Sequence, residues 1–78
     1  MSKSIGGYNA EAKKGKDAAT KYLQLWQNEI TVAGAGLASD LAGKKLSLAA
    51  YNLKRDELNK QTKDLNQCIG SINKQFGG

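Results

Sequence analysis

Small and apolar residues recur at spacings of four and three along most of this 78-residue chain, and no proline interrupts them. Such spacing places these residues on one side of an α-helix, where they can pack against a second helix. Few residues are β-branched or aromatic, whereas strands are rich in both kinds. The sequence therefore predicts an all-α fold.

The first helix is predicted over residues 9–33, with Asn9 as its N-cap. Residues 1–8, which contain two glycines, are predicted to form a flexible N-terminal segment. Trp26 and Ile30 are expected to face the second helix. They belong to a stripe with the spacing of an amphipathic helix: Ala12, Gly15, Ala19, Tyr22, Leu23, Trp26, Ile30, Ala33 and Leu37.

The strongest break in this pattern lies at residues 34–39. Gly34 and Gly36 favour a turn there, and Ser39 can cap a following helix. The missing proline leaves a continuous helix through this stretch as the alternative. With the turn, residues 9–78 form a single helical hairpin whose second helix covers residues 40–76.

This second helix is predicted to be longer than the first, so its far part would have no partner within the chain. Leu46 is expected to pack inside the hairpin. Exposed apolar stripes mark interfaces, and a contact that does not close on itself builds a filament. The sequence therefore predicts a hairpin that assembles into a helical filament. The expected subunit interface consists of Leu53, Leu58, Leu65, Ile69, Ile72 and Phe76.

Catalytic and metal-binding groups are scarce in this sequence. The chain has no histidine and only one cysteine, Cys68, which is expected to be packed in an apolar stretch. Serine–histidine and cysteine–histidine catalysis need a histidine, and an intrachain disulfide needs a second cysteine. We therefore expect no enzyme activity, no cofactor and no metal site. Self-association remains as the way to stabilise so small a chain.

Basic residues outnumber acidic ones, 12 to 7, which gives a net charge of +5. One alternative is therefore a small basic helical module that binds nucleic acid through Lys13, Lys14, Lys16, Lys44, Lys45, Lys54 and Arg55. Another alternative is a secreted helical-hairpin effector. No stretch has the ~20 apolar residues that a membrane span requires. No apolar run follows Lys3, so no cleaved signal peptide is expected.

The segment Tyr51-Asn52-Leu53-Lys54-Arg55, preceded by Leu41-Ala42 and Leu46, resembles the second helix of type III secretion needle proteins. The resemblance continues without a gap through Lys63 and Ile72 to Phe76. The family's turn commonly contains proline, whereas residues 36–39 here contain none.

The resemblance implies a subunit that polymerises into a hollow needle or pilus, through which unfolded effector proteins are exported. It implies secretion without a cleaved signal peptide and a place in an extracellular filament on the bacterial surface. The implied partners are other copies of the chain, a cytoplasmic needle chaperone, needle-tip and secretion-machine base proteins, and translocating effectors. Polar residues off the apolar seam are the expected lumen lining: Lys60, Lys63, Asn66, Asn73 and Lys74.

Overall fold

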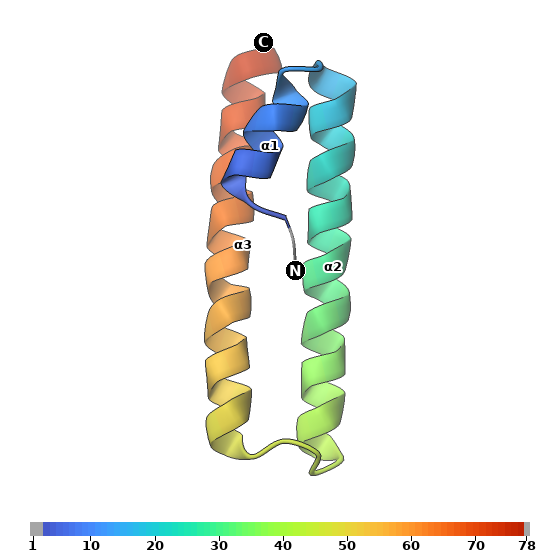
Figure 1. Cartoon of the computed structure of the whole chain (residues 1–78), viewed down its shortest axis with the longest axis vertical. Coiled ribbons are helices and arrows are strands. Elements are labelled where there is room, and N and C mark those ends of the chain that lie inside the picture. Colours follow the sequence, from blue (N-terminus) through green and yellow to red (C-terminus); the bar gives the residue numbers. More distant parts are fainter. Residues whose placement is uncertain (1–2, 78) are drawn as a thin grey trace.

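The computed structural model describes residues 3–77, which form three α-helices and no strand. They are α1 (Ile5–Ala12), α2 (Lys16–Ala42) and α3 (Leu48–Phe76). The long helices α2 and α3 run antiparallel, and α1 lies against the half of this hairpin nearest the C-terminus (Figure 1). The all-α prediction is confirmed, but the two-helix architecture is wrong.

Helix α1 replaces the second half of the predicted flexible segment, residues 5–8; residues 1 and 2 lie outside the described residues. Ser4 is the N-cap, and its hydroxyl accepts a hydrogen bond from the Gly7 N–H at 3.1 Å. An isolated helix of eight residues is unstable in water. Burial of Tyr8 and Ala12 against the hairpin supplies the stabilisation that the local sequence does not reveal.

The predicted first helix is divided at Gly15. This residue has φ = 128°, in the region that side chains other than glycine rarely adopt. Asn9 therefore lies within α1 instead of capping a helix. The chain reverses at this point, so α1 runs antiparallel to α2 (Figure 1).

The predicted turn is also wrong, because Gly34, Gly36 and Ser39 all lie inside α2. Each interior glycine weakens a helix by about 1 kcal/mol relative to alanine. Burial of Leu37 between α2 and α3 favours the continued helix. The alternative of a continuous helix through residues 34–39 is thus the observed one.

The actual reversal lies between Ala42 and Leu48. Gly43 ends α2 by donating its N–H to the Ser39 carbonyl at 2.8 Å, and Lys44 adopts a positive φ of 59°. Ser47 then caps α3, its hydroxyl accepting from the Ala50 N–H at 3.1 Å.

The buried core lies where all three helices meet. Its members are Tyr8, Ala12, Ala19, Leu23, Trp26, Leu65 and Cys68. Trp26 is fully buried, and its indole N–H donates to the Gln61 side-chain oxygen at 2.9 Å. This bond satisfies the one polar group of the indole and ties α2 to α3.

The expected overhang of the last helix does not occur, because α2 has 27 residues and α3 has 29. Leu65 is buried, and Ile72 and Phe76 pack against the core. The unpartnered apolar end predicted from the sequence is instead covered by α1 and α2.

Candidate functional site

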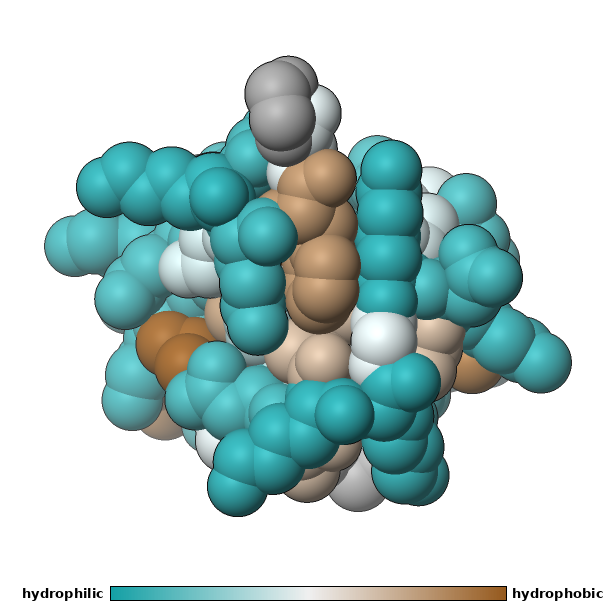
Figure 2. Space-filling model, turned by 90° about the horizontal axis from the view of Figure 1, so that it is seen from above, coloured by the Kyte–Doolittle hydropathy of each residue, from teal (hydrophilic) through white to brown (hydrophobic). Residues whose placement is uncertain are grey.

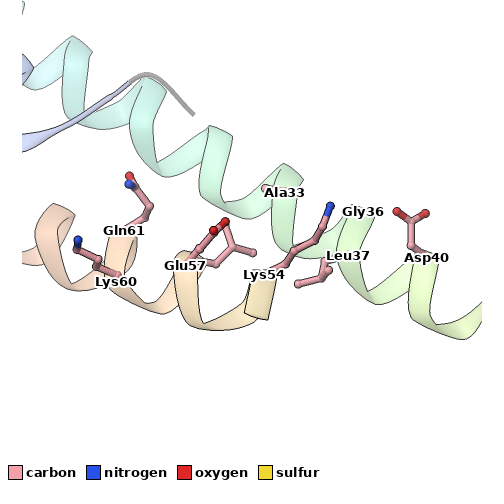
Figure 3. Close-up of a pocket in the computed structure, with 9 residues that line it drawn as sticks. Ala33, Gly36, Leu37, Asp40, Lys54, Glu57, Lys60 and Gln61 are labelled. Atoms are coloured by element: carbon pink, nitrogen blue, oxygen red, sulfur yellow. The ribbon is translucent and has the colours of Figure 1, made fainter. Parts of the chain in front are cut away.

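A groove of about 570 Å³ opens between α2 and α3 in the half of the hairpin that α1 leaves uncovered. Its side chains come from both long helices, as Figure 3 shows. The lining residues are Ala33, Gly36, Leu37, Asp40, Lys54, Glu57, Leu58, Lys60 and Gln61.

The groove opens on the side of the hairpin that carries α1. Tyr22 and Glu29 of α2 contact the start of the chain, through Ser4 and Lys3 respectively. Glu29, Ala33, Gly36 and Asp40 follow one another at spacings of three or four, which keeps them on one side of α2. We call this the α1 side of the hairpin. The groove is therefore the uncovered continuation of the site in which α1 lies.

The groove exists because α2 presents small residues here. A methyl group added to Gly36 would meet no atom within 4 Å. Nothing in the hairpin therefore accounts for glycine at this helical position, which costs about 1 kcal/mol relative to alanine. Leu37 is buried and Leu58 half-buried, so the groove has an apolar floor.

Two large apolar side chains flank this groove and are exposed to solvent. Val32 is 71% exposed and lies one turn before Gly36 on α2. Leu53 is 69% exposed and lies one turn before Glu57 on α3. Val32 was not predicted as a contact residue, although Leu25 and Val32, seven residues apart and off the core stripe, indicate a second apolar stripe in the sequence.

Exposed apolar residues also occur on the opposite side of the hairpin. Leu48 is 66% exposed and Ile69 is 37% exposed. At 100° per residue, they point about 140° and 160° away from Leu53 around α3. Leu48 was not singled out in the sequence either, because it lies two residues after Leu46, about 200° around a helix from the stripe that starts there. The hairpin thus exposes apolar side chains on both of its broad sides.

The predicted interface residues are divided between the core and the surface. Leu65 is buried, and Ile72 and Phe76 are half-buried against the core. Leu58 lies on the groove floor, whereas Leu53 and Ile69 are exposed. Only the exposed pair and Leu58 are free to contact another molecule without disturbing the core.

Trp26 and Ile30 pack in the hairpin, as the sequence predicted. Leu46 is half-buried but lies in the connection between α2 and α3, not in a helix.

The proposed lumen residues are all exposed on α3 but do not share one side: Lys60, Lys63, Asn66, Asn73 and Lys74. Lys60 lines the groove. Lys63 and Lys74 lie about 160° and 180° around α3 from the buried Leu65, on the edge away from α2.

Basic residues do not form one continuous patch. Lys13, Lys14 and Lys16 lie at the end of the hairpin seen in Figure 2, where hydrophilic side chains surround a strip of apolar ones. Lys44 and Lys45 lie at the other end of a molecule 46 Å long. Lys54 points into the groove, and its neighbour Arg55 lies about 100° further around α3.

Carboxylates at the groove remain available for contacts. Among residues 3–77 only two ion pairs form, Lys3–Glu29 at 2.8 Å and Lys14–Glu11 at 3.3 Å. Asp40 and Glu57, which both line the groove, take part in neither pair.

Two ionisable groups are buried in the core. Burial raises the pKa of the Tyr8 hydroxyl above its usual 10.0, and the nearby Cys68 thiolate raises it further. Burial, together with Asp64, raises the pKa of the Cys68 thiol above its usual 9.0. The core therefore keeps both groups protonated, which agrees with the prediction that Cys68 is packed.

These pKa shifts predict a loss of stability at alkaline pH. Below about pH 7.5 both states keep these protons, because the ordinary pKa of a thiol is about 8.5 and that of a tyrosine hydroxyl about 10. Above this pH, the unfolded chain loses protons that the folded chain retains, so the free energy of unfolding falls as pH rises. Urea unfolding at pH 7.5 and pH 10 measures this fall. Cys68→Ala should show a smaller fall than the wild-type chain; an equal fall would contradict the assignment to the thiol.

No three cysteine, aspartate or glutamate side chains within residues 3–77 converge to hold a metal ion. In the same residues, no helix is both long and apolar enough to cross a bilayer. The chain matches no protein-family model, and neither the curated proteins nor the solved structures contain a significant match to it.

Proposed function

We propose that this protein is a self-polymerising structural subunit that forms a hollow filament of the type III secretion needle kind. The observation that carries the proposal is the exposure of large apolar side chains on both broad sides of a thin hairpin. Val32 and Leu53 are exposed on the α1 side, and Leu48 is exposed on the opposite side. A surface of this kind favours association with other molecules.

Apolar patches on opposite sides of one subunit favour a particular kind of assembly. A contact between two different patches leaves one of each free, so further copies can add. Such contacts produce rings when the rotation closes and helical filaments when it does not. The small core of this chain, centred on Trp26, gives association an additional stabilising role.

The sequence resemblance gives the filament its proposed role. The matching segment Tyr51–Arg55 lies in the first turns of α3, the second long helix of the hairpin. On this proposal the chain is exported uncleaved, and the filament stands on the bacterial surface as a conduit for unfolded effectors. A cytoplasmic chaperone would cover the apolar sides before export. Lys63 and Lys74, on the outer edge of α3, are the residues we propose for the lumen.

Negative-stain electron microscopy of the purified, concentrated protein at neutral pH tests this function. Uniform filaments with a central channel are the expected result. Solid filaments would support assembly but contradict the conduit. A monodisperse monomer or dimer at high concentration, shown by sedimentation velocity, would overturn the proposal.

A further inference from the structure

The groove is a helix-binding site of which α1 uses only part. Within residues 3–77, the Lys3–Glu29 pair at 2.8 Å is the side-chain hydrogen bond that joins the start of the chain to α2 furthest along this helix. Residues 30–42 of α2 continue for ~20 Å beyond this pair. Over this length no third helix of the described residues 3–77 covers the α1 side of the hairpin (Figure 1).

We propose that this uncovered groove binds one stripe of α3 from a second copy of the chain. The stripe recurs every seventh residue on the side of α3 opposite Leu53: Leu48, Arg55, Thr62 and Ile69. A seven-residue spacing keeps these residues in a nearly straight line along the helix. The inference rests on the proposed function and names the two surfaces that make the filament contact.

Shape favours this pairing. The open space above Gly36 allows a helix to approach the backbone of α2 closely. Leu48 of the incoming copy would cover the apolar floor formed by Leu37 and Leu58. The contact would also bury Val32 and Leu53, which flank the groove. These are the most exposed of the large apolar side chains, so their burial removes apolar surface from water.

Charge favours it as well. Asp40 and Glu57 line the groove and form no ion pair within residues 3–77. The stripe carries Arg55 at its second position and no carboxylate. Lys54 and Lys60 also border the groove, so the pairing requires a register that brings Arg55 to the carboxylates. Charge placement of this kind sets register and selects partners.

The two surfaces lie on opposite sides of the same hairpin. Each copy can therefore accept one neighbour in its groove and offer its stripe to another. Such a contact is heterologous and does not pair a surface with itself. Variants that each lack one of the two surfaces can therefore distinguish this contact from a two-fold symmetric dimer, in which one surface pairs with itself.

Complementation between two assembly-deficient variants tests the pairing. The groove variant is Val32→Asp/Leu53→Asp, and the stripe variant is Leu48→Asp/Arg55→Glu. All four positions are exposed, so both variants should fold with wild-type helical content. Each variant alone should sediment as a monomer of 8.3 kDa. Their 1:1 mixture should form a complex of twice this mass, because one intact groove meets one intact stripe.

Gln24→Asp is the control, because Gln24 is exposed on α2, lies about 160° around the helix from Asp40 in the groove, and belongs to neither surface. It should assemble like the wild-type chain. If the wild-type chain polymerises but the mixture stays monomeric, or if either variant polymerises alone, the groove–stripe contact is overturned and the filament function stands. A wild-type chain that stays monomeric at high concentration overturns both.

Discussion

Replacing Trp26 by alanine is expected to lower the free energy of unfolding by about 3–5 kcal/mol. The indole is fully buried among residues of all three helices. The substitution removes its apolar contacts and leaves a cavity that this small core cannot fill by rearrangement. It also leaves the Gln61 side-chain oxygen without its donor. Domains of this size have a total stability of roughly 4–12 kcal/mol, so the substitution removes a quarter or more of it.

Urea unfolding followed by circular dichroism measures this loss. Gln27→Ala is the control, since Gln27 adjoins Trp26 in sequence but is exposed, and its substitution should change stability by no more than about 0.5 kcal/mol. Trp26→Phe should lie between the two, because it keeps much of the ring volume but loses the hydrogen bond. A Trp26→Ala variant as stable as the control would show that the core does not depend on the indole.

Replacing Tyr8 by alanine is expected to detach α1 from the hairpin at a cost of about 3 kcal/mol. Tyr8 is only 2% exposed and is the largest side chain that α1 buries. Without it, α1 has eight residues, two of them glycine, and too little buried surface to remain helical. The amides of residues 5–12 should then exchange with solvent far faster, while those of α2 and α3 near Gln61 stay protected.

Tyr8→Phe separates packing from hydrogen bonding at this position. The Tyr8 hydroxyl is buried and has no hydrogen-bond partner among residues 3–77. An unsatisfied buried hydroxyl is destabilising, so phenylalanine should be at least as stable as tyrosine. Hydrogen exchange measures both variants. Loss of α1 protection in Tyr8→Phe would mean that the hydroxyl, and not the ring, holds α1 in place.

Both core substitutions differ from the surface changes that test assembly. Val32 and Leu53 are exposed, so their replacement should leave the free energy of unfolding of the monomer nearly unchanged. A loss of filaments without a loss of monomer stability therefore identifies a contact between copies. A loss of both would indicate damage to the hairpin itself.

Helix content and the identity of the central core residues could be predicted from the sequence. Trp26 and Leu65 belong to patterns of four- and three-residue spacing that repeat over several helical turns. No proline interrupts these patterns, so helix is the structure that they favour. Leu53 and Ile69 were predicted from the sequence as interface residues. Their exposure in the folded chain could not be predicted, because it depends on which side of each helix is covered.

The position of the turn and the existence of α1 were decided by tertiary packing. Gly34 and Gly36 are locally stronger turn signals than the segment at Gly43, yet burial of Leu37 favours helix through both. Ile5–Ala12 is too short to be helical alone and forms because Tyr8 enters the core. The groove follows from the same packing, since α1 covers only half of one side. The sequence by itself thus determined that the chain is helical, through local periodicity. Only the assembled helices decided where it turns and which surfaces stay open, because those depend on contacts between residues far apart in sequence.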